Sequence, residues 1–371
     1  FKQKTAYEML RSLVGSEMCI RDRNCGGPSA GGRARMKEHI RKLVDRKDLS
    51  QSETGEAFDA IMSGEATPAQ IAGFLVALKM KGETVAEIAG GAASMRKHAV
   101  FVDAGGAAVV DTCGTGGDGL DTFNISTTAA FVAAGAGVPV AKHGNRAIGS
   151  RCGSADVLAA LGVNIEAETE TVERCIREAG IGFLFAPRLH PAMKHALGPR
   201  RELGVRTIFN MLGPLTNPAG AKHQVIGVFA PELTETFAQV LAMLGCRRAF
   251  VVHGHDGMDE ITVTAATRVS ELSGGRVRTY EFDPREFIGE YAELPALRGG
   301  DPTQNAEITR AILQGRRGPC RDIVCLNAAA AIVAGGCAAD MKEGWRKAND
   351  SIDSGRAMKA LESLARISKG M

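Results

Sequence analysis

The sequence lacks the patterns that mark membrane-spanning proteins, disulfide frameworks and zinc sites. No apolar run reaches the length of about 18 residues that a transmembrane helix needs. The nine cysteines are scattered singly, without a Cys-x-x-Cys pair or a Cys/His spacing typical of a metal site. We therefore expect reduced thiols in a cytoplasmic protein.

The sequence also has little excess charge of either sign. The 45 Lys and Arg residues nearly balance the 42 Asp and Glu residues, which gives a net charge of +3. Residues 1–35 hold seven of the basic and three of the acidic residues, so the remaining chain carries a net charge of about −1. This balance gives no electrostatic reason to expect a nucleic acid or a membrane surface as partner.

What the sequence has is enough length and apolar content for about two domains, with 371 residues of which 44% are hydrophobic. Residues 1–35 differ from the rest. They lack the apolar core of a signal peptide, and Glu8, Glu17 and Asp22 argue against a transit peptide. The segment also resembles translated sequencing-adapter text. We expect a non-native or disordered leader, with Met36 as the native start.

From Met36 the pattern is helical, and after about residue 107 short apolar strands alternate with helices. Three capping boxes mark helix starts, namely Ser50 with Glu53, Thr67 with Gln70 and Thr84 with Glu87. The expected strands are 109–110, 138–141, 183–185, 225–229, 249–252 and 323–326. This order predicts an α/β fold, with a small helical N-terminal domain and a larger α/β domain around a mostly parallel central sheet. Ligands of such folds bind beyond the carboxyl ends of the strands.

The stretch "DTCGTGGDGLDTFNIST" at 111–127 contains four glycines and five hydroxyl side chains but no His, Lys or Glu. It matches G-x-G-x-x-G, yet no helix opens at the glycines and no acidic residue follows about twenty positions on, as a dinucleotide site requires. We interpret it as a phosphate site, because glycines let backbone N–H groups approach oxygens closely. Asn124 is then expected to cap a helix whose first turn contains Ser126 and Thr127.

Three further stretches follow the glycine-rich one. "KHGNRAIGSRCGSADVLAALG" at 142–162 begins with a lysine after a strand, and "RRELGVRTIFNMLGPLTNP" at 200–218 places arginines beside a loop. "HGHDGMDEIT" at 253–262 offers Asp259 and Glu260, hard oxygen ligands suited to Mg²⁺. Together with "GTGGD" and "TFNIST", and in this order, these stretches resemble the anthranilate phosphoribosyltransferase family over essentially all of residues 36–371.

The resemblance implies a two-domain enzyme with its active site between the domains. The helical domain would comprise 36–106 and about 188–218, and the α/β domain 107–187 and 219–371. The family usually forms a homodimer through its helical domains. It transfers the phosphoribosyl group of phosphoribosyl diphosphate to the amine of anthranilate, the second step from chorismate to tryptophan.

The resemblance also assigns site residues by position in this sequence. Phosphoribosyl diphosphate contacts are implied for Gly114, Gly117, Asp118, Thr122, Asn124, Ile125, Ser126, Thr127, Lys142, His143, Gly144, Asn145, Arg146, Ala147, Ile148, Gly149, Ser150 and Ser154. Anthranilate contacts are implied for Gly114, Asn145 and Arg200. Two Mg²⁺ ions per subunit are implied, with Ser126, Asp259 and Glu260 as ligands.

The chemistry explains why the glycine-rich stretch needs no His, Lys or Glu for proton transfer. Breaking the bond from ribose C1 to diphosphate creates a cation and a polyanion, which positioned donors and metal stabilise. Arg200 would hold the anthranilate carboxylate, and the neutral amine needs no deprotonation before attack. His143 and His190 are candidates for assisting the amine, with a structural role as the alternative.

Two positions depart from the family pattern, and two other functions remain open. Gly149 and Cys152 stand where the family often has serine, and Gly149 would weaken a diphosphate contact. A pyrimidine nucleoside phosphorylase would have a similar lysine loop without the metal pair. A non-catalytic relative would have lost Arg200 or the pair Asp259–Glu260, and this chain has both.

Overall fold

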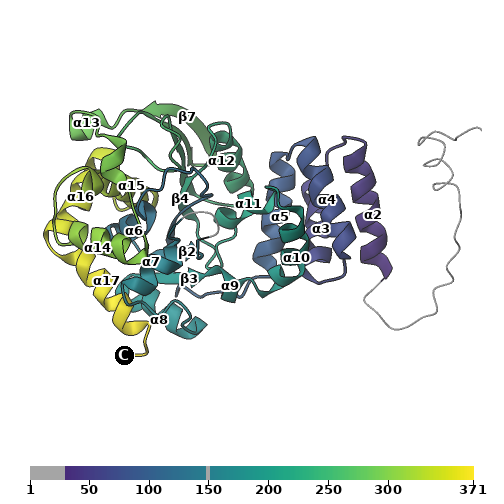
Figure 1. Cartoon of the computed structure of the whole chain (residues 1–371), viewed down its shortest axis with the longest axis horizontal. Coiled ribbons are helices and arrows are strands. Elements are labelled where there is room, and N and C mark those ends of the chain that lie inside the picture. The colour runs from purple at the N-terminus through teal and green to yellow at the C-terminus, as the bar shows by residue number, and fades with distance from the viewer. Residues whose placement is uncertain (1–29, 148–150) are drawn as a thin grey trace, which may run out of the picture. The chain divides into compact units, whose positions relative to one another are not determined.

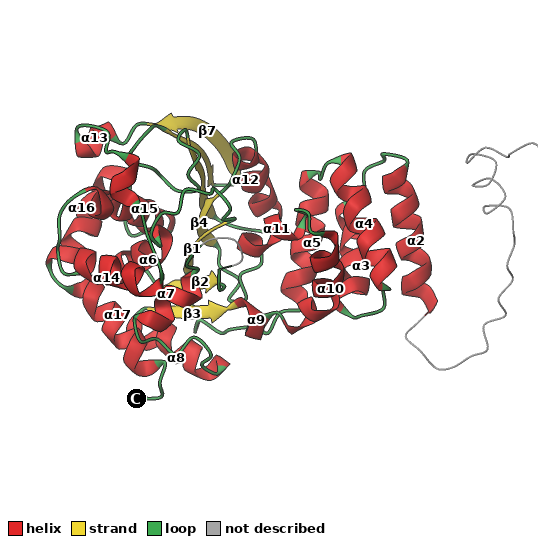
Figure 2. Cartoon of the chain, in the orientation of Figure 1, coloured by secondary structure: helices red, strands yellow, loops and turns green. Residues whose placement is uncertain are grey.

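The computed structural model describes residues 30–147 and 151–371. Most of the expected leader, together with Ile148, Gly149 and Ser150, lies outside the described residues. The described chain combines a bundle of helices with a helix-covered sheet (Figure 1), as the sequence predicts. Figure 2 shows that the strands gather in one part only and that the bundle is purely helical.

The helical part is built from two separate stretches of chain. Its helices are α2 (Ala30–Val44), α3 (Gln51–Met62), α4 (Pro68–Lys81), α5 (Val85–Lys97), α10 (Lys194–Leu203) and α11 (Phe209–Leu212). Helix α10 packs on α3 and α4, and α11 packs on α5. Helices from two stretches far apart in the sequence therefore pack against one another. Helix α2 begins six residues before Met36, inside the expected leader.

All three predicted capping boxes are present in this part. Ser50 and Thr84 each accept a hydrogen bond from a backbone N–H three residues on, and the glutamate at that position bonds back to the cap. Thr67 and Gln70 do the same at α4, where Pro68 occupies the first helical position. Local sequence thus determines where these helices begin.

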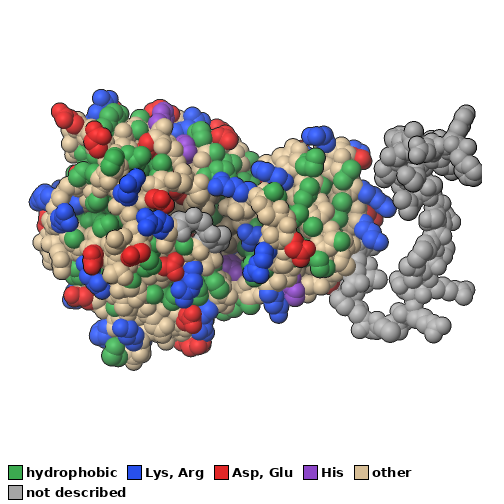
Figure 3. Space-filling view, in the orientation of Figure 1, with side chains coloured by type: hydrophobic (Ala, Val, Ile, Leu, Met, Phe, Trp, Pro, Cys, Tyr) green, Lys and Arg blue, Asp and Glu red, His purple; other side chains and the backbone are tan. Residues whose placement is uncertain are grey.

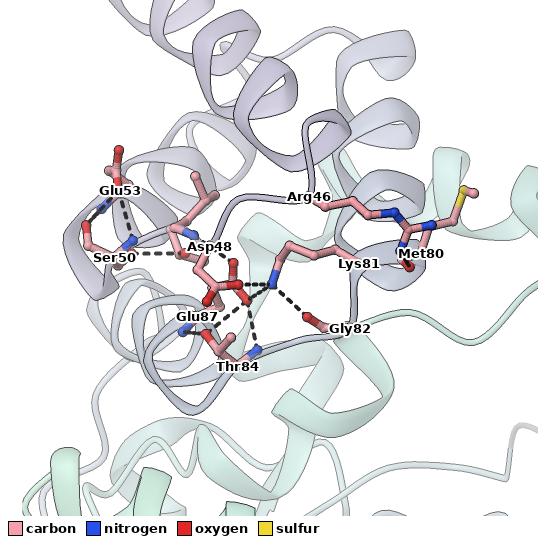
Figure 4. A network of polar contacts seen from close by, with 11 residues as sticks. Arg46, Asp48, Ser50, Glu53, Met80, Lys81, Gly82, Thr84 and Glu87 are labelled. Carbon is pink, nitrogen blue, oxygen red and sulfur yellow. Dashed lines mark hydrogen bonds and ion pairs between the residues drawn. The ribbon is translucent and has the colours of Figure 1, made fainter.

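A buried ion pair joins the end of α4 to the first turn of α5 (Figure 4). The Lys81 Nζ lies 2.9 Å from Glu87 Oε2 and 2.8 Å from Asp48 Oδ1. The Glu87 side chain is fully buried, and its Oε1 also accepts a hydrogen bond from the backbone N–H of Leu49 at 2.9 Å. The loop before α3 is therefore tied to the loop before α5.

The sheet contains strands in the order β3-β2-β1-β4-β5-β6-β7. Its strands are β1 (Val110–Gly114), β2 (Val140–Gly144), β3 (Ile181–Phe185), β4 (His223–Gly227), β5 (Arg248–Gly254), β6 (Thr267–Ser273) and β7 (Arg276–Phe282). The pairs from β3 to β5 are parallel, and β6 and β7 add antiparallel pairs at one edge. The carboxyl ends of the parallel strands therefore share one edge, where a ligand site is expected.

Helices cover both faces of this sheet. They are α6 (Ile125–Gly135), α7 (Ser154–Ala160), α8 (Thr169–Ala179), α9 (Ala186–Leu189), α12 (Leu233–Met243), α13 (Arg285–Ile288), α14 (Pro302–Leu313), α15 (Pro319–Ala334), α16 (Met341–Asp353) and α17 (Arg356–Ile367). Short 3₁₀ turns lie at Pro191–Met193, Gly213–Leu215 and Leu294–Leu297. One large apolar cluster lies among α6, α14, α15, α16, α17 and the sheet. A second cluster joins α12, β4 and β5 to the helical part.

The structure corrects one strand prediction and adds two strands that the sequence analysis missed. Residues 323–326 are not a strand but lie within α15, a helix of 16 residues whose continuous run of alanines and aliphatic residues is almost entirely buried. A short apolar run does not by itself distinguish a buried strand from a buried helix. Strands β6 and β7 were not predicted. None of the helices in the described ranges is long and apolar enough to cross a membrane.

Candidate active site

The glycine-rich loop begins where β1 ends, at the carboxyl edge of the sheet. Gly116, Gly117 and Gly119 have φ angles of 65°, 83° and 73°. Residues with a Cβ rarely adopt these angles, so the backbone of the loop itself requires glycine at these positions. The following helix, α6, starts at Ile125 and carries Ser126 in its first turn. Backbone N–H groups from the loop and from the helix terminus thus lie at the same edge.

The acidic loop after β5 meets this glycine-rich loop. The backbone N–H of Gly116 donates to Asp259 Oδ2 at 2.9 Å, and that of Ser126 donates to Glu260 Oε1 at 3.1 Å. Each carboxylate is therefore held by a main-chain donor of the phosphate-site segment. The family resemblance implies that Ser126, Asp259 and Glu260 share one metal site. In the structure these three residues lie close together.

Two glycines on paired strands make the space for Asp259. Gly114 of β1 lies opposite Gly227 of β4 in the sheet register. A Cβ on Gly227 would lie 1.5 Å from the backbone oxygen of Asp259, and a Cβ on Gly114 would lie 2.5 Å from Asp259 Oδ2. A side chain on Gly227 would push the acidic-loop backbone away from the sheet, and one on Gly114 would displace the Asp259 carboxylate. The sequence analysis singled out Gly114 but missed Gly227.

The half-buried carboxylates of Asp259 and Glu260 fit a cation. Burial, with Asp118 nearby, raises the pKa of Asp259 to about 7. Burial and the neighbouring Asp259 raise the pKa of Glu260 well above its usual range. Among the described residues, no group of three or more His, Cys, Asp or Glu side chains could by itself hold a metal. A carboxylate pair completed by substrate oxygens is the arrangement that Mg²⁺ commonly adopts.

Lys142 reaches this site from below the sheet edge. It lies within β2, not after it as expected, and is almost fully buried. Its Nζ donates to the backbone oxygen of Thr112 and lies 3.4 Å from Ser126 Oγ. Burial lowers the pKa of the Lys142 ammonium, and nearby Asp111 opposes that effect. Lys142 therefore places a cationic group under the first turn of α6.

Asn124 occupies the N-cap position of α6, but its side chain does not cap the helix. The side-chain capping prediction was therefore wrong. Asn124 Nδ2 donates to the backbone oxygen of Cys152 at 3.1 Å, and Asn124 Oδ1 accepts from Asn305 Nδ2 at 2.9 Å. The Cys152 thiol also donates to Asn124 Oδ1 at 3.3 Å. Asn124 instead joins three segments around the start of α6.

The loop that follows β2 is anchored by the start of α7. The backbone oxygen of Asn145 accepts from Ser154 Oγ at 3.2 Å. Asp156 Oδ2 accepts from the backbone N–H groups of Ala147 and Gly153, both at 2.9 Å. Arg146 is exposed and donates to Asp156 Oδ1 at 3.3 Å. These bonds tie Asn145, Ala147 and Gly153 to the start of α7.

The other predicted contact residues lie on the same elements. Thr122 of the glycine-rich loop pairs with Arg298 in an isolated β-bridge. Ile125 and Thr127 are buried in the first turn of α6, and Gly144 is the last residue of β2. Asp118 Oδ1 accepts from the backbone N–H of Leu120 at 3.3 Å. The described residues expected to bind phosphoribosyl diphosphate lie on β1, on β2 or in the segments that directly follow these strands.

Two histidines face each other between β2 and the segment leading to α10. The rings of His143 and His190 lie 5.1 Å apart between centroids, and both are buried. The Nε2 atom of each has no hydrogen-bond partner among the described residues. Burial lowers the pKa of His143 to about 3 and that of His190 to about 4. Both imidazoles are therefore neutral near pH 7.

Arg200 lies near the end of α10, and its guanidinium lies over the Phe209 ring, 5.0 Å from its centroid. No described residue forms a hydrogen bond or ion pair with the Arg200 guanidinium, and burial lowers its pKa. Arg206, which the sequence analysis did not select, donates to the backbone oxygen of Gly117 at 3.1 Å. Its guanidinium also lies 4.7 Å from the centroid of Phe229. Arg206 thus links the Arg200 segment to the glycine-rich loop.

Two family models match the chain along its two structural parts. The helical bundle domain of a glycosyl transferase family matches residues 37–99, and the a/b domain of that family matches residues 106–358. The fold and the acidic, glycine-rich site thus define a glycosyl transferase of this two-part class.

Proteins similar to this chain in sequence and structure identify its family within this class. Proteins named anthranilate phosphoribosyltransferase from Desulfosudis oleivorans and Syntrophobacter fumaroxidans are each 58% identical over 331 residues, which is 89% of this chain and 98% of each relative. The crystal structure of the Thermus thermophilus enzyme of that name is 46% identical, with a TM-score of 0.84 over 89% of this chain and 99% of that one. The Saccharomyces cerevisiae enzyme in complex with PRPP and Mg is 30% identical, with a TM-score of 0.82 over 91% and 99% of the two chains. The chain belongs to the anthranilate phosphoribosyltransferase family.

Proposed function

We propose that this chain transfers the phosphoribosyl group of 5-phospho-α-D-ribose 1-diphosphate to the amine of anthranilate at the edge formed by β1, β2 and the acidic loop. The products are N-(5-phosphoribosyl)anthranilate and diphosphate, the second step from chorismate to tryptophan. The carrying observation is the contact of Gly116 and Ser126 with Asp259 and Glu260. It joins a phosphate-type loop, a helix N-terminus and hard oxygen ligands in one place.

Phosphoribosyl diphosphate lies, in this proposal, along the glycine-rich loop, the first turn of α6 and the loop after β2. Mg²⁺, when bound by Asp259, Glu260 and Ser126, supplies positive charge that neutralises the leaving diphosphate. We propose two ions, because the two carboxylates are oriented by separate donors, Gly116 and Ser126. Lys142 adds its charge beneath Ser126. The yeast relative has PRPP and Mg bound, which supports this assignment.

Anthranilate lies on the side of the site formed by α10 and the loop after β2. Arg200 binds its carboxylate, because the guanidinium is partly buried and has no protein counter-charge. Asn145 and Gly114 complete this side. A further structure of the yeast relative is in complex with 4-fluoroanthranilate, which supports a site for such a ring.

The reaction needs no strong base from the protein. The bond from ribose C1 to the diphosphate oxygen breaks and its electron pair leaves with diphosphate, while the amine nitrogen forms a new bond to C1. The nitrogen then loses a proton, which goes to water or to the leaving diphosphate. His143 and His190 are too weakly basic to hold this proton, so we propose that they shape the anthranilate side as neutral rings.

We also propose domain limits at 36–106 with 188–218 and at 107–187 with 219–371, and a homodimer formed through the helical part. A groove between α2 and α4 supports the dimer. Its lining includes Val44 and Met80, exposed by 67% and 68%. Large exposed apolar side chains that share one groove mark interaction surfaces. The seven described cysteines are all free, which supports a reducing compartment such as the cytoplasm.

Anthranilate fluorescence tests the reaction. We expect fluorescence to fall when phosphoribosyl diphosphate and Mg²⁺ are both present, and not when either is left out. The double variant Asp259→Ala/Glu260→Ala should fold normally, judged by circular dichroism, and lose turnover. Phosphorolysis of a pyrimidine nucleoside without anthranilate turnover would instead identify the phosphorylase alternative. Normal turnover of the double variant at saturating Mg²⁺ would exclude the proposed metal ligands.

A further inference from the structure

Asn327, a buried residue of α15, binds the backbone of the acidic loop at Ile261. Asn327 Oδ1 accepts a hydrogen bond from the backbone N–H of Ile261 at 3.0 Å, and Asn327 Nδ2 donates to the backbone oxygen of Ile261 at 2.9 Å. Nδ2 also donates to the backbone oxygen of Ile323, one turn earlier in α15, at 2.9 Å. Both polar backbone groups of Ile261 are thus paired with one carboxamide.

This contact requires an amide side chain. A carboxamide presents an acceptor and two donors, which match one N–H and two carbonyl oxygens here. Asn327 and Ile261 are 2% and 1% exposed, so water does not replace a lost partner. The bond to Ile323 fixes the rotation of the Asn327 side chain relative to its own helix. The loop backbone is therefore positioned relative to α15, the rigid centre of the larger apolar cluster.

Glu260 is the residue immediately before this clamped position. Its carboxylate is fixed at the other end by the Ser126 N–H, and its backbone leads directly into the peptide group that Asn327 binds. Asp256 makes a second set of contacts in this loop. Its carboxylate accepts from the backbone N–H of Met258 at 3.0 Å and from Thr262 Oγ1 at 2.6 Å. Asn327 thus acts on the Glu260 side of the loop.

We infer that Asn327 is a positioning residue that sets the place of the Glu260 carboxylate for Mg²⁺-dependent binding of phosphoribosyl diphosphate. The inference rests on the proposed function, since it assigns Glu260 to the metal. Residues that orient metal ligands through hydrogen bonds commonly change metal affinity by about ten- to a hundredfold when replaced. Asn327 touches neither substrate nor metal and acts through the loop backbone.

The test compares two variants of Asn327 with a control of similar burial. Asn327→Leu keeps the branched shape, with bulkier methyl groups, and removes all three bonds, and Asn327→Asp keeps the acceptor but turns an oxygen toward two carbonyl oxygens. Ser351→Ala is the control, because Ser351 is fully buried in α16 and its hydroxyl donates to the backbone oxygen of Val132 at 2.8 Å rather than to the acidic loop. Each protein is titrated calorimetrically with phosphoribosyl diphosphate over a range of Mg²⁺ concentrations, without anthranilate, and its melting temperature is recorded.

We expect the Asn327 variants to need about ten- to a hundredfold more Mg²⁺ for half-maximal binding. Ser351→Ala should lower the melting temperature while leaving the Mg²⁺ dependence unchanged. A Mg²⁺ dependence like that of the wild type in a folded Asn327 variant would overturn the inference. So would an equal loss of binding with and without Mg²⁺, because that pattern indicates general damage to the fold.

A double-mutant cycle separates positioning of Glu260 from any other role, and it uses Asn327→Asp if Asn327→Leu does not fold. In a Glu260→Gln background, Asn327→Asp should add less than a twofold further loss of Mg²⁺-dependent binding, because the ligand that it positions is already removed. Additive losses would contradict the inference. A wild-type protein that fails to bind phosphoribosyl diphosphate with Mg²⁺ would instead contradict the proposed function itself.

Discussion

Gly227→Ala should disable the enzyme without unfolding it. Gly227 does not have a positive φ, so alanine fits its backbone conformation. The new Cβ would lie 1.5 Å from the backbone oxygen of Asp259 and 2.4 Å from its carbonyl carbon. Ordinary contacts begin at 3.4 Å, so the acidic loop must move by about 2 Å. A misplacement of about 1 Å in an active site can cost about a hundredfold in rate.

We therefore expect kcat/KM of Gly227→Ala to fall at least about a hundredfold, measured by anthranilate fluorescence. Stability should fall by only about 1–3 kcal/mol, the usual cost of an added methyl group in a packed core. Gly55→Ala is a matched control, because its Cβ would meet only the backbone oxygen of Gly90, at 3.8 Å. A kcat/KM within threefold of wild type in Gly227→Ala would refute the reasoning that Gly227 makes room for the acidic loop.

Three further predictions concern residues outside the acidic loop. Lys81→Met should lower the free energy of unfolding by about 3 kcal/mol, because it leaves the fully buried Glu87 carboxylate without its cation. An unchanged midpoint of urea unfolding would contradict this prediction. Arg200→Ala should weaken anthranilate binding about ten- to a hundredfold through loss of a charged contact of roughly 1.5–3 kcal/mol, and Arg200→Lys should recover only part. Equal losses for both substrates would assign Arg200 a structural role. Burial depresses the pKa values of His143 and His190 to about 3 and about 4. Below about pH 6.5 the unfolded chain therefore binds more protons than the folded chain, and the free energy of unfolding should fall as the pH drops from 6.5 toward 4. Replacing both histidines with asparagine should flatten that part of the stability profile.

Local signals in the sequence predicted the local features of this fold. The capping boxes at Ser50, Thr67 and Thr84 are each completed within four residues, so the sequence alone contains both partners. The same is true of the glycine-rich loop, whose positive φ angles follow from its own backbone. The grouping of Asp259 with Ser126 needed the family resemblance, because no local pattern links positions so far apart.

What the sequence analysis missed depends on partners distant in the chain. Asn327 acquires its role from Ile261, and Gly227 from Asp259, and neither residue stands in a recognisable motif. Strands β6 and β7 could have been predicted from the sequence, because Gly274 and Gly275 separate the two strand segments as the turn of a β-hairpin does. Their polar composition, with little burial in β7, hid them from a search for apolar runs.

The apolar cluster shared by α12, β4, β5 and the helical bundle has a consequence for truncation. Phe58 and Ile88 of the bundle belong to the same cluster as Phe237 of α12 and Val251 of β5, and the chain from Gly31 to Met371 forms one compact unit. A fragment that begins at residue 106 would expose the side of α12 that packs on α5, and a fragment that ends at residue 99 would lack α10 and α11. The bundle is therefore not a detachable module, and the two parts should melt in one cooperative transition.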